Sequence, residues 1–228
     1  MKKIIVIFAA MYLAGCAGSV PMKPEERAKI RQVTINKNIQ TPKPTIYGSA
    51  ETAGTIVGGA LGAVIASGGD DASVDENYLL SNNIDIKKIF KQDLLKELKA
   101  RGLFKVVDSG KSDATIDITI TNYGFWIGGK FMNFDAVRPT LYVRLSIKDV
   151  SGKEIWSGYD FVGNMSSMTE IVSVEEVMAK PVVAEKSLRQ ASKLVAKLLV
   201  ADIEGREVPD KEISSVKVND SELLSMAK

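Results

Sequence analysis

The segment DATIDITITNYGFW, residues 113–126, carries the clearest indication of the fold class of this chain. Its side chains alternate: Ile116, Ile118 and Ile120 fall on one side of an extended backbone, and Thr115, Asp117, Thr119 and Thr121 fall on the other. A strand with one apolar and one polar side belongs to a sheet that is covered on one face only. We therefore expect a sheet with a single layer of helices packed against it.

The neighbouring segments extend this pattern to further strands. RPTLYVRLSIKD, residues 138–149, again alternates, with Leu141 and Val143 on the apolar side and Tyr142 and Arg144 on the polar side. The short turn VSGK leads directly into EIWSGYDFVGN, so these two segments are expected to form a hairpin. LFKVVD, residues 103–108, predicts a short strand, and IRQVTINKNI, residues 30–39, predicts a first strand.

Two amphipathic helices complete the predicted domain. In residues 84–102, apolar side chains recur every four residues from Ile86 to Leu98, and Gly102 is the expected C-cap. A second apolar stripe follows Pro181, a favoured residue at a helix start, and its members are Ala184, Leu188, Ala191, Val195 and Leu198. Two helices on one face of a mostly antiparallel sheet of about four to five strands make an α+β domain, here over residues 84–204. Residues 205–228 are expected to form a polar tail.

The N-terminus carries an export signal. MKKIIVIFAAMYLAGC has two lysines, an apolar run and small residues before a cysteine, the pattern of a signal peptide over residues 1–15. LAGC, residues 13–16, resembles the bacterial lipobox, which implies cleavage before Cys16 and lipid on that cysteine; the alternative is an ordinary signal peptide with a chance cysteine. No aspartate follows Cys16, so the resemblance implies the outer membrane of a Gram-negative cell. Residues 16–29 then form a lipidated tether.

An uncharged, glycine-rich segment, residues 52–69, follows a strand and proline-containing connection over residues 30–51. On a helix, Gly54, Gly58, Gly62 and Ala66 form a stripe of small residues at steps of four, the glycine-zipper pattern of closely packed membrane helices. A solvated linker would expose its large apolar side chains. A membrane-associated helix and a helix buried within the protein or an oligomer both remain open, since 18 residues give about 27 Å of helix, slightly short of a bilayer core.

Composition excludes much of enzyme chemistry. The chain has no histidine and one cysteine, Cys16, which removes histidine-based catalysis, cysteine nucleophiles and common zinc sites. GFWIGGKF, residues 124–131, has P-loop spacing, but Phe131 stands where Ser or Thr must be. Without Lys2 and Lys3, 28 basic residues balance 28 acidic ones, so no nucleic-acid partner is indicated. We expect a non-enzyme with no metal and no cofactor apart from the lipid on Cys16.

The aromatic stretch NYGFWIGGKFMNF, residues 122–134, has two interpretations. Its aromatic side chains could close the end of the core. Alternatively, Phe125, Trp126, Phe131 and Phe134 could contact a partner subunit or lipid headgroups, where amphipathic aromatic residues are favoured.

Residues 85–202 resemble a family of envelope lipoproteins. RGLFKVVD, ATIDITITNYG and LYVRLSIKDVSGKEIWSG are similar to the lipoproteins with a TolB N-terminal-like domain, including the ABC-transport auxiliary and curli-secretion types; Asp149, Gly152 and Trp156 fit their pattern. The glycine zipper resembles that of TraT, although TraT-like chains carry a longer paired hairpin late in the sequence. The resemblance implies ring-like oligomers or accessory factors, without enzymatic activity. The expected function is a self-associating outer-membrane lipoprotein; the alternative is a periplasmic accessory subunit of a transport or secretion complex.

Overall fold

The computed structural model describes residues 20–47, 74–108, 110–127, 136–163 and 168–218. The predicted signal peptide, Cys16 and the glycine segment 52–69 lie outside these ranges. The helices and strands are α2 (Pro24–Arg27), β1 (Gln32–Ile35), β2 (Thr45–Tyr47), α5 (Val74–Ser81), α6 (Ile86–Arg101), β3 (Lys105–Val106), β4 (Ala114–Ile127), β5 (Ala136–Asp149), β6 (Glu154–Val162), β7 (Val172–Ser173), α7 (Val174–Ala179), α8 (Pro181–Glu204) and α9 (Asp210–Ser214).

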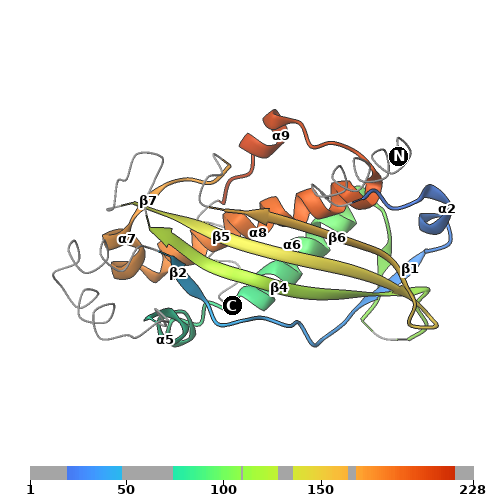
Figure 1. Cartoon of the computed structure of the whole chain (residues 1–228), viewed down its shortest axis with the longest axis horizontal. Coiled ribbons are helices and arrows are strands. Elements are labelled where there is room, and N and C mark those ends of the chain that lie inside the picture. The colour runs from blue at the N-terminus through green and yellow to red at the C-terminus, as the bar shows by residue number, and fades with distance from the viewer. Residues whose placement is uncertain (1–19, 48–73, 109, 128–135, 164–167, 219–228) are drawn as a thin grey trace, which may run out of the picture.

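The sheet is curled and mixed, with the order β3-β1-β4-β5-β6; β2 also pairs with β4 and β7 with β5 (Figure 1). The three long strands are antiparallel, and the predicted β5–β6 hairpin is confirmed. The expectation of a mostly antiparallel sheet holds for these strands only, because β1 runs parallel to β3 and β4, and β2 runs parallel to β4. Parallel neighbours need a long crossover connection, and the connection between β1 and β3, which contains α6, is long enough to provide one.

The predicted first helix is confirmed as α6, together with its end. Asp85 is the N-cap, and its carboxylate accepts hydrogen bonds from the backbone N–H groups of Lys87 and Lys88, at 2.9 and 3.3 Å. Gly102 ends the helix in the left-handed conformation at φ 63°, which costs glycine little.

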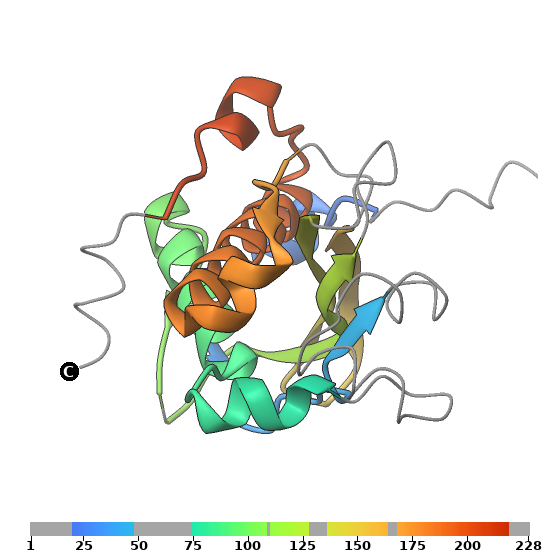
Figure 2. The same cartoon turned by 90° about the vertical axis from the view of Figure 1, so that its left-hand side faces the viewer.

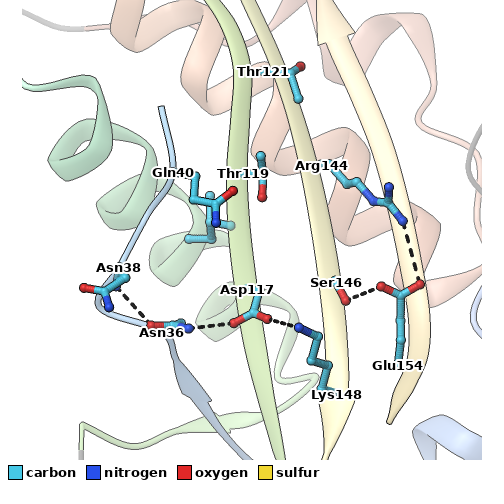
Figure 3. A pocket seen from close by; sticks show the side chains of 11 residues that line it. Asn36, Asn38, Gln40, Asp117, Thr119, Thr121, Arg144, Ser146, Lys148 and Glu154 are labelled. Carbon is cyan, nitrogen blue, oxygen red and sulfur yellow. Dashed lines mark hydrogen bonds and ion pairs between the residues drawn. The ribbon is translucent and has the colours of Figure 1, made fainter. Parts of the chain in front are cut away.

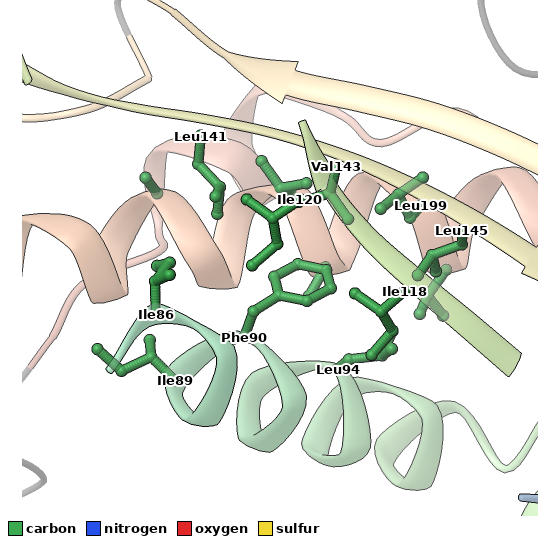
Figure 4. Close-up of a cluster of buried hydrophobic side chains, with 14 of the residues drawn as sticks. Ile86, Ile89, Phe90, Leu94, Ile118, Ile120, Leu141, Val143, Leu145 and Leu199 are labelled. Carbon is green, nitrogen blue, oxygen red and sulfur yellow. The ribbon is translucent and has the colours of Figure 1, made fainter. Parts of the chain in front are cut away.

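An apolar core lies between the helices and one face of the sheet (Figures 2 and 4). Phe90 and Leu94 of α6 and Leu199 of α8 contact the isoleucines that β4 directs inward, and all of them are almost fully buried. The α+β architecture with two main helices on one face is therefore confirmed. Between the helices, the hydroxyl of Ser192 on α8 donates a 2.6 Å hydrogen bond to the buried carboxylate of Asp93 on α6.

Removing this hydroxyl should weaken the packing of the two helices. We expect Ser192→Ala to lower the free energy of unfolding by about 1–2 kcal/mol, because the buried carboxyl group of Asp93 loses a hydrogen-bond donor. Urea denaturation followed by circular dichroism measures the change. Ser214→Ala, on an exposed serine of α9, is the matched control. A loss no larger for Ser192→Ala than for the control would contradict the prediction.

The described part of the predicted polar tail is packed against the domain. After α8 the chain forms α9 and then runs back along α8, where the Gln190 side-chain amide donates to the carbonyl of Val216 at 3.3 Å. Val218 is buried. Up to residue 218 the chain therefore still belongs to the folded domain.

Candidate functional site

The face of the sheet that the helices leave uncovered carries a polar groove of about 740 Å³ (Figure 3). Outward side chains of β4 and β5 form its floor, and the loop after β1 forms one wall. The residues that line it are Asn36, Asn38, Gln40, Asp117, Ile118, Thr119, Thr121, Arg144, Ser146, Lys148 and Glu154. Successive side chains of a strand point to opposite faces of the sheet, so β4 directs every other residue into the core and the polar residues between them into the groove.

Two carboxylates are held firmly in this groove. Asp117 accepts a hydrogen bond from the amide of Asn36 at 2.9 Å and contacts the ammonium group of Lys148 at 2.7 Å. Partial burial alone would raise the pKa of Asp117, but these two partners outweigh it and lower that pKa. Glu154 accepts a 2.6 Å hydrogen bond from Ser146, the main cause of its lowered pKa. Both carboxylates are therefore ionised at neutral pH.

An aromatic cluster lies beside the groove on the same face of the sheet. Tyr142 on β5 stacks on Phe161 of β6, with ring centroids 5.0 Å apart, and Tyr159 lies 6.1 Å from Phe161. Phe161 is 49% exposed and Tyr159 is 40% exposed. Gly163 leaves room for the Tyr142 ring, since a Cβ at this glycine would lie 3.0 Å from the tyrosine hydroxyl.

The segment that follows the predicted lipid attachment site is docked on the opposite side of β6, at the end of α8. The indole N–H of Trp156 donates to the carbonyl of Val20 at 2.9 Å, and Met22 is 3% exposed. The guanidinium of Arg27 on α2 donates to the carbonyls of Ile203 and Glu204, at 3.2 and 2.7 Å. The last carbonyls of a helix have no partner within the helix, and the positively charged guanidinium supplies one at the C-terminus of α8. Of the predicted tether 16–29, residues 20–29 therefore belong to the folded domain.

A pair of aspartates lies close to this docking site. Asp160 of β6 points toward the helix layer, and its side chain is hydrogen-bonded to that of Asp202 in the last turn of α8. The backbone carbonyl of Asp202 also accepts a hydrogen bond from the N–H of Met22. Burial raises the pKa of Asp160 to about 8, and the neighbouring charge and hydrogen bond of Asp202 add to the rise. Asp160 therefore carries its proton at neutral pH and can donate it to the carboxylate of Asp202.

The structure corrects one predicted contact residue. Phe125 is 3% exposed and belongs to the core, so it is not available to a partner. A β-bulge between Ile120 and Asn122 shifts the alternation of β4, so that Tyr123 and Phe125 point inward. Trp126 is half-buried. Phe131, Phe134, Cys16 and the stripe Gly54, Gly58, Gly62 and Ala66 lie outside the described residues.

Sequence reasoning missed the aromatic cluster as a unit. It placed Tyr142 on the polar side of its strand, but it could not pair that ring with Phe161, because the register of β5 against β6 brings them together. The signal was present as aromatic residues at the outward positions of two adjacent strands.

Neither a metal centre nor a membrane span occurs in the described part of the chain. No three histidine, cysteine, aspartate or glutamate side chains there are grouped so that they could hold a metal ion. No helix among those residues is long and apolar enough to cross a bilayer.

No protein-family model and no curated protein matches this chain. Several solved structures are similar in outline. XCC0632 of Xanthomonas campestris, described as DUF330, is 13% identical, with 83% of this chain and 94% of that one covered and a TM-score of 0.41. The PelC dodecamer of Paraburkholderia phytofirmans is 9% identical over 84% and 96% of the chains, with a TM-score of 0.35. Lipoprotein GNA1162 of Neisseria meningitidis is 16% identical over 68% and 94%, with a TM-score of 0.24. Likenesses this weak say nothing about activity, so the function has to be inferred from this chain's own residues.

Proposed function

We propose that this chain is a non-enzymatic lipoprotein of the outer membrane, anchored through lipid on Cys16, whose domain lies against the membrane surface and self-associates through the glycine segment. The docking of residues 20–29 on β6 and α8 is the observation that supports it. Only Ala17, Gly18 and Ser19 separate Cys16 from Val20. At about 3.5 Å per residue, the lipid attachment point lies within about 14 Å of the folded domain.

The length of the connection between Cys16 and the folded domain decides how far the domain can stand from the membrane. If residues 17–31 formed a free tether up to β1, the domain could stand about 55 Å from the membrane. With Val20 and Met22 held on the domain, most of that reach is lost. A short connection keeps neighbouring copies at the same height on the membrane, which favours contact between their equivalent segments.

The glycine segment supplies the proposed contact between copies. Four interior glycines make a helix about 4 kcal/mol less stable than alanines would, and close packing in a bilayer or oligomer can offset this cost. Gly54, Gly58, Gly62 and Ala66 would form the smooth stripe at which two helices approach each other.

Bulky residues on the stripe should therefore separate the copies. We expect Gly58→Leu or Gly62→Leu to convert the assembly extracted from membranes into monomers, as measured by native mass spectrometry in mild detergent. Gly59→Leu is the matched control, because it makes the same substitution one residue off the stripe. A wild-type protein that is already monomeric, or an equal effect of all three substitutions, would overturn self-association through this stripe.

One observation favours the alternative, an accessory subunit of an envelope transport or secretion complex. Among the described residues, β6 forms backbone ladder bonds with β5 only, so its other edge could accept a strand from a different protein. Photocrosslinking from Ser157 on this strand distinguishes the two functions. Stable adducts with another envelope protein and none between copies would favour the accessory role.

A further inference from the structure

The polar groove keeps hydrogen-bonding groups that the protein itself does not use. Across the described residues, the side-chain amides of Asn38 and Gln40 and the hydroxyl of Thr119 form no hydrogen bond, although all three line the groove. The guanidinium of Arg144 lies 3.8 Å from the carboxylate of Glu154, beyond hydrogen-bonding distance. These groups supply both donors and acceptors to a ligand.

The remaining polar groups of the groove are already oriented. Asn36 and Lys148 hold Asp117 from two sides, and Ser146 holds Glu154 (Figure 3). Side chains that are already held lose little conformational freedom when a ligand binds, and this lowers the cost of binding.

The charges of the described residues that line the groove balance. Its two carboxylates, Asp117 and Glu154, face two cations, Arg144 and Lys148. Neither an anionic nor a cationic ligand gains a long-range attraction from such a set. The ligand best matched to it is uncharged and rich in hydroxyl or amide groups.

The position of the groove disfavours an extended peptide. It lies over the middle of the sheet, where β4 is paired with β1 and β5, and β5 with β4 and β6. A peptide strand therefore finds no backbone partners there. Among the described residues that line the groove, Ile118 is the only apolar one, so these residues form no pocket for apolar side chains.

The aromatic cluster continues the groove along β5 and β6. Tyr159 lies directly opposite Arg144 in the strand register, and Phe161 lies opposite Tyr142. About half of the Phe161 side chain is exposed to water, which leaves apolar area that a ligand can cover. A sugar ring has one face of C–H groups, which packs on an aromatic ring, and a rim of hydroxyls, which suits the adjacent amides.

We propose that the groove and the aromatic cluster together bind an uncharged glycan, with sugar rings stacked on Tyr159 and Phe161 and hydroxyl groups hydrogen-bonded to Gln40, Asn38 and Arg144. The glycan site uses none of the residues of the glycine segment. Loss of self-association and loss of glycan binding are therefore separate results.

The test uses the full mature lipoprotein in a polyoxyethylene detergent, because a sugar-based detergent would compete. The probes are chitohexaose, cellohexaose and maltohexaose, followed by titration calorimetry. At least one of them should bind the wild type. Replacing both Tyr159 and Phe161 by leucine keeps apolar area but removes the flat rings, and should weaken binding about tenfold or more, equivalent to about 1.4 kcal/mol. Gln40→Ala should weaken it severalfold.

Two controls separate ring stacking from nonspecific adhesion. Tyr159→Phe keeps the ring and should bind within about twofold of wild type. Ile171→Ala removes an equally exposed apolar side chain from another part of the surface and should leave binding unchanged. Thermal melts confirm that each variant is folded. The proposal is overturned if none of the three hexasaccharides binds the wild type, or if the double leucine variant binds as well as the wild type does.

Discussion

Asp160→Asn should make the protein more stable at pH 8.5 by about 2–3 kcal/mol, while leaving its stability near pH 4 almost unchanged. In the folded protein, burial and the nearby carboxylate of Asp202 raise the pKa of Asp160 to about 8, from 3.8 for a free side chain. The folded state therefore holds a proton that the unfolded state releases. The stabilising effect of this proton on the folded state is full below about pH 4 and is lost as the pH rises to about 8.

Asparagine removes the ionisation but keeps the hydrogen bond. Its amide can donate to Asp202 at every pH, so the variant avoids a second negative charge beside Asp202 in the last turn of α8, where the helix dipole already disfavours negative charge. We expect less than the full value of about 1.4 kcal/mol per pKa unit, because Asp160 is only half-buried and keeps part of its hydration.

Urea denaturation of wild type and variant at several pH values between 4 and 9 measures this difference. Asp210→Asn makes the same substitution at an exposed position, and its stability should stay parallel to that of the wild type across the range. If the wild type and Asp160→Asn differ by the same amount at pH 4 and pH 8.5, the carboxyl pair is not linked to folding.

Met22→Asp should release the docked segment from the domain without unfolding it. Met22 is 3% exposed, and an unpaired carboxylate in its place would cost several kcal/mol. A short segment near the chain terminus avoids this cost by leaving its site, and α2 then loses its bonds to the end of α8. Trypsin should consequently cut after Arg27 and Lys29 at least about tenfold faster, since cleavage follows the open population.

The neighbouring Val20→Asp is the matched control. The side chain of Val20 is exposed, so a carboxylate there stays in water and should leave the cleavage rate as in the wild type. Circular dichroism shows whether the domain itself remains folded. Unchanged cleavage of a folded Met22→Asp protein would show that the segment is not held by this contact, and the close placement of the domain at the membrane would then lose its support.

Local periodicity predicted the elements that build the core. The spacing of Ile86, Phe90, Leu94 and Leu98 predicted both the existence of α6 and its buried side, because successive helical turns place residues four apart on one face. The alternation of β4 likewise predicted which side is buried, as far as Ile120.

The prediction of buried residues failed at two places: where a bulge interrupts the alternation of a strand, and where a helix packs against two neighbours at once. Beyond Ile120 a bulge reverses the alternation, and Phe125 turns into the core. In α8, Leu199 is buried where the predicted stripe named Leu198, because the helix packs against the sheet and α6 at once and its buried side is broader than one stripe.

Local sequence patterns were enough to predict the α+β class, the two main helices, the hairpin and an export and lipidation signal, because each depends on residues within a few positions of one another. The docking of residues 20–29, the contact between Asp160 and Asp202, and the aromatic cluster of Tyr142, Tyr159 and Phe161 come instead from the three-dimensional fold. These contacts join segments far apart in the chain. Strand register and the packing of α8 on the sheet set them, and no short-range pattern encodes either.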